Sequence, residues 1–78
     1  MKLIVEGLPR WVTSEHLCSL FQTYGSVRFV SVIFDRESRH TGFGCVEMSS
    51  MREAEDALTA LNNREIKGTV LRVKPSGR

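Results

Sequence analysis

The chain has 78 residues, which suffices for one small domain and is too short for two separate hydrophobic cores. A hydrophobic content of 41% supports a packed core and excludes a disordered chain. The net charge of +2 indicates a polyanionic partner only weakly, but its distribution is uneven. Residues 53–56 are mainly acidic and basic residues dominate from Arg64 onward, so one side of the surface should attract a polyanion.

Several classes of protein are excluded by what the sequence lacks. The two cysteines do not form a close pair, and no cysteine–histidine cluster has metal-ligand spacing, so we expect no disulfide framework and no metal. No nucleophile stands beside a base and no phosphate-binding loop is present, so we expect neither an enzyme nor a cofactor. Without a membrane-spanning segment or signal peptide, the sequence predicts a cytoplasmic protein with no membrane contact.

A strand over residues 3–6 and a helix after it are the first predicted elements. In this strand Leu3 and Val5 point to one face and Ile4 and Glu6 to the other. The first face is expected to be buried and the second exposed. Residues 7–9 contain a proline and end the strand. Either Thr13 or Ser14 is expected to cap the helix, whose buried stripe is Leu17, Leu20, Phe21 and Tyr24. Gly25 is the predicted left-handed residue that ends it.

The next predicted strand, residues 27–34, has a blurred alternation because most of its residues are apolar. The preferred register buries Val30 and Val32 and exposes Ser31 and Ile33. A polar loop that includes Arg39 follows. Residues 41–48 then alternate clearly, with Thr41, Phe43, Cys45 and Glu47 on the face opposite the core.

A second helix and a last strand complete the chain. Residues 50–53 have the pattern of a capping box, and Ala54, Ala57, Leu58 and Leu61 form a buried stripe. Residues 66–68 are a predicted turn, and residues 70–74 a strand with Leu71 and Val73 inward. We expect a domain over residues 1–75 and a short tail over residues 76–78.

This order predicts one antiparallel sheet with both helices on one face, made from two right-handed strand–helix–strand units. The other face is expected to be open to solvent. Alternation assigns to it the following residues: Ile4, Glu6, Phe43, Cys45, Val70, Arg72 and Lys74.

The whole chain resembles the RNA recognition motif family. Residues 41–48 keep Gly42, Phe43, Gly44 and Val46 of the family's octamer, and residues 3–8 match its shorter motif. The bare domain is most similar to the single-domain RNA-binding proteins of bacteria. The resemblance implies a ferredoxin-like α+β fold, a four-stranded antiparallel sheet with two helices on one face, and a role in post-transcriptional regulation.

In this family three aromatic residues on the two central strands stack on RNA, at the positions of Ile4, Phe43 and Cys45 here. Only Phe43 is aromatic. An isoleucine at the position of Ile4 occurs in functional members of the family, whereas Cys45 removes a stacking platform worth roughly 1–3 kcal/mol per base. The resemblance therefore implies binding of single-stranded RNA with reduced affinity. The expected RNA-binding residues are Ile4, Glu6, Phe43, Cys45, Arg72 and Lys74.

Four further residues are possible secondary contacts: Ser31, Ile33, Arg39 and Trp11. Trp11 either covers one end of the core or offers a second contact surface. Arg72 and Lys74 either meet RNA or are solvated edge residues. The alternative function is a protein–protein interaction domain on the same fold, favoured by the missing aromatics, the carboxylates on the open face and Trp11.

Overall fold

The computed structural model describes residues 1–76 as two helices and six strands. These are β1 (Lys2–Glu6), α1 (Ser14–Gln22), β2 (Val27–Phe34), β3 (His40–Met48), α2 (Met51–Leu61), β4 (Glu65–Ile66), β5 (Thr69–Val70) and β6 (Arg72–Pro75). Residues 77 and 78 of the predicted tail lie outside the described residues.

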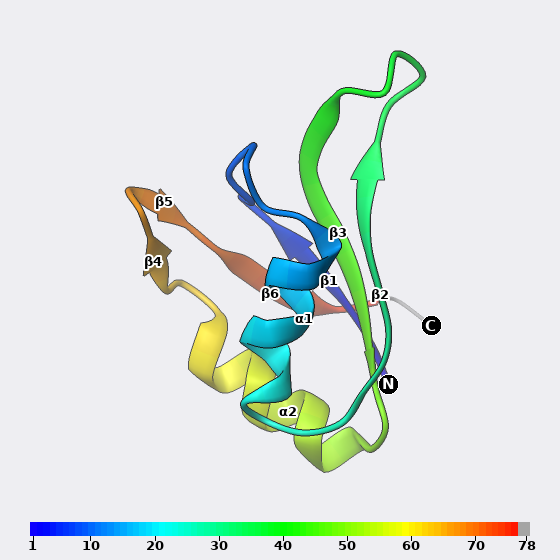
Figure 1. The fold of residues 1–78 in the computed structure, drawn as a ribbon. Coiled ribbons are helices and arrows are strands. Elements are labelled where there is room, and N and C mark those ends of the chain that lie inside the picture. Colours follow the sequence, from blue (N-terminus) through cyan, green and yellow to red (C-terminus); the bar gives the residue numbers. More distant parts are fainter. Residues whose placement is uncertain (77–78) are drawn as a thin grey trace.

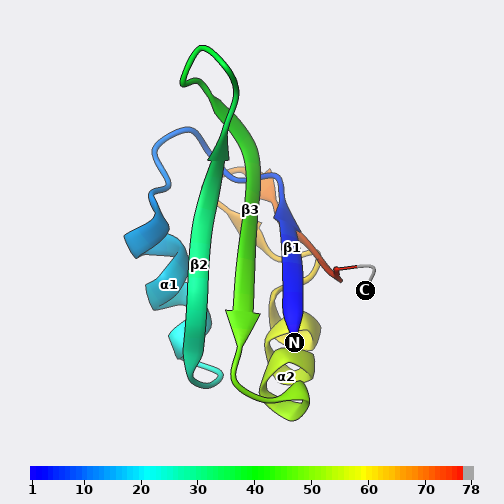
Figure 2. The same ribbon diagram turned by 90° about the vertical axis from the view of Figure 1, so that its right-hand side faces the viewer.

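Four of the strands form one sheet in the order β2-β3-β1-β6, and every neighbouring pair is antiparallel. Both helices pack on the same face of this sheet, and no element of residues 1–76 covers the other face (Figures 1 and 2). The α+β fold predicted from the sequence is therefore confirmed.

The core lies between the sheet and the two helices, as the alternation of β1 illustrates. Leu3 and Val5 are fully buried, whereas Ile4 and Glu6 remain partly exposed. The other fully buried hydrophobic residues come from α1, β3, α2 and the last segment: Leu17, Phe21, Val46, Met48, Ala54, Ala57, Leu61 and Leu71.

Helix α1 begins with reciprocal hydrogen bonds and ends earlier than predicted. The His16 amide donates to Thr13 Oγ1 over 3.3 Å, and the Thr13 amide donates to His16 Nδ1 over 3.1 Å. After Gln22 the Tyr24 amide donates to the Phe21 carbonyl over 3.0 Å, so a tight turn closes the helix. Gly25 is consequently not the left-handed cap predicted, because its φ of 158° is far from the left-handed helical value of about 57°. Residues with a side chain still rarely adopt this φ.

The need for a glycine at position 25 comes instead from Glu53, a residue far along the chain. A Cβ atom on Gly25 would lie 2.5 Å from Cδ of Glu53, so a side chain there would collide with α2. The cap of α2 is correspondingly half a capping box. Ser50 Oγ accepts from the Glu53 amide over 3.2 Å, but the Glu53 carboxylate accepts from the Ser26 amide over 3.2 Å. This carboxylate therefore joins α2 to the turn before β2.

The last predicted strand, residues 70–74, is divided between two sheets. β4 and β5 form a separate hairpin in which Val70 lies opposite Glu65. At Leu71 the chain leaves this hairpin, and β6 then pairs with β1. Val70 therefore does not belong to the four-stranded sheet, contrary to the assignment by alternation. Leu71 and Val73 are buried as predicted.

Candidate functional site

The uncovered face of the sheet brings the six predicted binding residues into two adjacent rows. On one side of β1, Ile4 lies opposite Cys45 and Glu6 opposite Phe43. On the other side, Ile4 lies opposite Lys74 and Glu6 opposite Arg72. Residues opposite one another in antiparallel strands are close enough for their side chains to interact. The two rows are Cys45–Ile4–Lys74 and Phe43–Glu6–Arg72.

Phe43 has an exposed ring and belongs to a strand whose opposite face packs against α1. Its side chain is 43% exposed, although it belongs to a central strand. The next residue, Gly44, is buried, and a Cβ there would lie 2.8 Å from Leu17 Cδ2. The missing side chain thus lets β3 approach α1 closely and fixes the height of the ring above the core.

His40 fixes the beginning of β3. The Gly42 amide donates to His40 Nδ1 over 3.0 Å, while His40 Nε2 lies 3.1 Å from the Val12 carbonyl oxygen. Both contacts are satisfied when the ring carries its proton on Nε2 and donates it to Val12. The ring therefore ties the segment before α1 to the strand that carries Phe43.

The charges of the two rows are partly compensated. Lys74 Nζ lies 2.7 Å from Glu6 Oε2, so these two residues form an ion pair on the open face. Arg72 forms no ion pair within the described part of the chain, residues 1–76. Arg72 is thus the readily available cation for an anionic ligand, and Lys74 must first exchange its partner.

The secondary contacts on β2 extend the same face. Ser31 lies opposite Cys45, and Ile33 is 41% exposed. Phe29, which the sequence interpretation missed, is opposite Glu47 and is 53% exposed. Phe29 is two residues from Ser31 and four from Ile33, a spacing that places it on the same face of the strand. The continuous apolar run of β2 obscured this signal.

Arg39 does not join these rows, because carboxylates of its own loop hold it. Its Nε lies 3.0 Å from Asp35 Oδ2, and its Nη2 lies 3.0 Å from Glu37 Oε1. Asp35 Oδ1 also accepts from the amides of Arg39 and Glu37. The Arg39 amide and then its guanidinium, together with the Glu37 amide, hold the pKa of Asp35 below its usual value.

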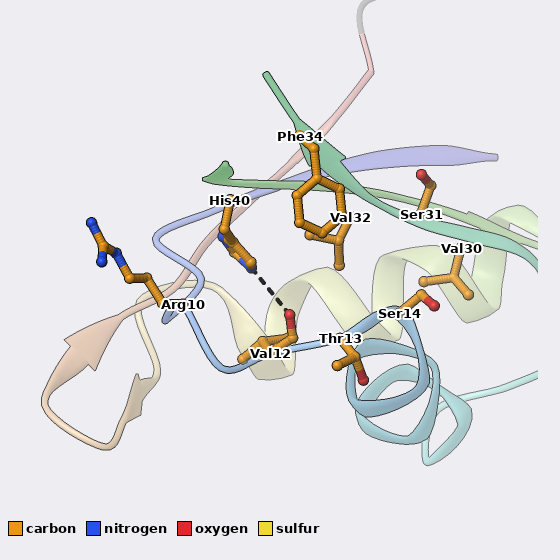
Figure 3. Close-up of a pocket in the computed structure, with 9 residues that line it drawn as sticks. All are labelled: Arg10, Val12, Thr13, Ser14, Val30, Ser31, Val32, Phe34 and His40. Carbon is orange, nitrogen blue, oxygen red and sulfur yellow. Dashed lines mark hydrogen bonds between the residues drawn. The ribbon is translucent and has the colours of Figure 1, made fainter. Parts of the chain in front are cut away.

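Trp11 lies in the segment between β1 and α1, outside the rows of the sheet. It is 48% exposed and packs edge-on against His16, with ring centroids 5.3 Å apart. A hollow of about 360 Å³ lies nearby, between the start of α1 and β2 (Figure 3). Val12, Val32 and the 55% exposed Phe34 contribute its apolar lining.

Two kinds of structure are absent from residues 1–76: a metal-binding cluster and a membrane-spanning helix. No group of three or more His, Cys, Asp or Glu residues there could hold a metal ion. Neither α1 nor α2 has the length and apolar composition needed to cross a membrane.

Comparisons with known proteins point to one family. The profile of the RNA recognition motif matches residues 3–72. The chain is 45% identical over 74 residues to the chloroplastic RNA-binding protein CP29B of Arabidopsis thaliana, which covers 94% of this chain and 26% of that protein. It is 42% identical over 80 residues to the chloroplastic 28 kDa ribonucleoprotein of Spinacia oleracea, with 97% and 34% covered.

The chain thus spans about a quarter to a third of the length of these curated relatives. They are plant chloroplast proteins, so they give no support to the predicted likeness to bacterial single-domain proteins.

Solved structures agree with the family profile. The crystal structure of RNA Binding Protein PG1 is similar with a TM-score of 0.94 and 39% identity, covering 100% of this chain and 95% of that one. The Sxl-lethal protein/RNA complex is similar with a TM-score of 0.90 and 32% identity, covering 96% of this chain and 47% of that one.

Proposed function

The chain belongs to the RNA recognition motif family, and from this premise we propose that its open sheet face binds single-stranded RNA. The observation that carries the proposal is the exposed ring of Phe43 in a row with Glu6 and Arg72. Phe43 stacks on a base or a ribose, and Arg72 meets a phosphate or a base edge. Ile4 and Cys45 give apolar contact in the neighbouring row.

We further propose that the affinity is lower than that of a domain with three stacking aromatics. Ile4 and Cys45 occupy two of the aromatic positions, and each absent platform removes roughly 1–3 kcal/mol per base. The ion pair between Lys74 and Glu6 adds to this effect, because the cation must leave the carboxylate before it can bind a phosphate.

The test is an RNA titration of Phe43→Ala beside the unchanged protein. A short mixed-sequence single-stranded RNA pool is added at low and then moderate salt, and binding is followed by fluorescence anisotropy and by NMR shifts. We expect Phe43→Ala to weaken binding roughly 5- to 150-fold. Phe34→Ala is the matched control, since Phe34 is also an exposed phenylalanine, 55% against 43% for Phe43, but lines the hollow beside α1.

Two results would contradict the proposal. One is the absence of RNA-induced shifts in the unchanged protein at low salt. The other is equal binding by the Phe43 and Phe34 variants. Shifts at Ile4, Cys45 and Arg72 that weaken with salt would support it.

A protein contact is the second candidate function, favoured by the exposed ring of Phe34, which lines the hollow, and by the exposed ring of Trp11, whose chain neighbours Arg10 and Val12 line it. Large exposed apolar groups near one another are a common mark of interaction surfaces. Affinity capture with the unchanged protein and with Trp11→Ala tests it. A partner retained equally by both would argue against Trp11 as the contact.

We also propose the bounds of the domain and its cellular role. Residues 1–75 form the domain, and the protein acts without catalysis in post-transcriptional regulation. Ser76 is the first residue of the proposed tail, although its amide still donates to the Lys2 carbonyl over 2.8 Å. The chloroplast names of the relatives do not favour the predicted cytoplasmic location, which cell fractionation would decide.

A further inference from the structure

Phe29 is an exposed aromatic on the open face at a position outside the three motif positions considered above. It lies opposite Glu47, and its neighbour Ser31 lies opposite Cys45. Phe29 is therefore a diagonal neighbour of Cys45 across the β2–β3 pair. Diagonal neighbours have Cβ atoms roughly 7–8 Å apart, a distance that an aromatic ring can reach across.

Folding does not account for an aromatic side chain here. Phe29 is 53% exposed and belongs neither to the buried core nor to the partly buried residues packed against it. In β2 that packing is done by Val27, Val30 and Val32. An exposed ring on a solvent face is available for a ligand instead.

The surroundings of Phe29 repeat those of Phe43. Phe29 on β2 lies opposite Glu47 on β3, and Glu47 lies opposite Lys2 on β1, so the three residues form a row across the sheet. The row of Phe43 has the same order of aromatic, carboxylate and cation. Like Arg72, Lys2 forms no ion pair within residues 1–76.

We propose that Phe29 is a second base-stacking platform, which takes over on β2 the role of the aromatic missing at Cys45. The proposal rests on RNA binding by the open face. Four residues of β3 and one strand spacing separate the rows of Phe43 and Phe29, which places the two positions roughly 14 Å apart. Each ring therefore receives its own base, and Lys2 meets the phosphate beside the second.

The ligand is a single strand whose unpaired bases lie across β1, β3 and β2. Stacking on Phe29 tolerates any base, since every base has a π-face. The missing aromatic at Cys45 thus shifts one stacking contact toward the β2 edge of the sheet.

The test measures RNA affinity for a series of variants at Phe29, with the same mixed-sequence single-stranded RNA pool. Phe29→Leu keeps the apolar bulk without a π-face, and we expect it to bind roughly 5- to 150-fold more weakly. Phe29→Tyr should bind as the unchanged protein does. Phe34→Ala, on the same strand and equally exposed, should have no effect.

A rescue variant tests whether the ring of Phe29 replaces the aromatic side chain that is missing at Cys45. Adding Cys45→Tyr to Phe29→Leu restores an aromatic at the neighbouring position, and affinity should recover. Circular dichroism and thermal melting check that each variant folds, which is expected because Phe29 lies outside the core.

The outcomes separate this inference from the proposed function. If Phe43→Ala weakens binding and Phe29→Leu does not, the role of Phe29 is refuted while RNA binding by the open face stands. If the unchanged protein binds no RNA, both fail. Failure of Cys45→Tyr to rescue Phe29→Leu would refute the substitution of one platform by the other.

Discussion

Gly44 determines how closely β3 approaches α1, and this distance sets the position of Phe43. A Cβ at Gly44 would lie 2.8 Å from Leu17 Cδ2 and 3.0 Å from Leu8 Cδ1. Both leucines are buried, so they have little room to move aside. The requirement for glycine here is steric and comes from packing.

We therefore expect Gly44→Ala to lower the free energy of unfolding by about 1–3 kcal/mol, as overpacking of a core usually does. Urea denaturation followed by circular dichroism measures it. Ser19→Ala, on the exposed side of α1, should change the free energy of unfolding by less than about 0.5 kcal/mol. Equal unfolding midpoints for the two variants would show that the core adapts to the added methyl group.

Single residues are also where the sequence was least informative. Gly25 was predicted to end a helix, whereas its missing side chain makes room for Glu53, a residue far along the chain. Phe29 was overlooked because it stands in a nearly continuous apolar run. Both roles depend on which residues face one another after folding, and a local pattern does not contain this information.

At the scale of elements, the loop between β2 and β3 is organised by one carboxylate. Asp35 Oδ1 accepts from the amides of Glu37 and Arg39 over 2.9 Å each, and Oδ2 accepts from Arg39 Nε over 3.0 Å. These donors favour the ionised carboxylate, with the Arg39 amide as the largest contribution, so the pKa of Asp35 is lowered in the folded state.

A lowered folded-state pKa gives a defined dependence on pH. The stabilisation of the loop by Asp35 is fully present above the pKa of the unfolded chain and is lost as the pH falls through the folded-state pKa. NMR titration should show the Glu37 and Arg39 amide shifts changing together with the Asp35 carboxyl, below the usual aspartate range. An Asp35 titration at or above the usual range would contradict the arrangement.

The alternation of side chains between two faces predicted β1 and β3 correctly. It failed for residues 70–74, where the chain changes its pairing partner. In β1, and in β3 from Phe43 onward, buried residues alternate with more exposed ones, and both strands formed as expected. The alternation also runs on from Val70 to Lys74, although the chain exchanges the β4–β5 hairpin for the main sheet at Leu71. Such an exchange leaves the side-chain pattern unaltered, so only the three-dimensional structure reveals it.

For the molecule as a whole, the charges on the open face limit its attraction for a polyanion. Glu6 neutralises Lys74 through their 2.7 Å ion pair, and Glu47 lies between Phe29 and Lys2 in its row. The sequence predicted the fold and the six residues that the register brings together on the open face, and their RNA binding stays a prediction. The Glu6–Lys74 pairing was not predicted, because side-chain partners on a sheet depend on the register.

Removing the Glu6 charge should therefore strengthen RNA binding and make it more salt-dependent. In Glu6→Gln, Lys74 becomes free to meet a phosphate, and the slope of log affinity against log salt should steepen by about 0.7 for one added contact. Stability should change little, since exposed ion pairs contribute about 0–1 kcal/mol. Anisotropy titrations over a range of salt concentrations measure the slope.

The control for this variant is Glu65→Gln, which changes the net charge equally but lies on the β4–β5 hairpin. We expect its slope to equal that of the unchanged protein. Identical slopes and affinities for the Glu6 and Glu65 variants would mean that net charge alone matters and that the Glu6–Lys74 pair does not restrict the site.

The two register shifts in the β2–β3 pairing also affect whether copies of this protein can pair through the edges of their sheets. The strands β2 and β6 are the outer edges of the sheet, where unpaired peptide groups can recruit another chain. β6 is short and ends at Pro75, so it offers little to pair with. β2 is long and apolar, but its irregularities at residues 27–29 and 32–34 bend the edge away from a straight ladder. We therefore expect these two irregularities to disfavour edge-to-edge aggregation, and a variant with a regular β2 to aggregate more readily.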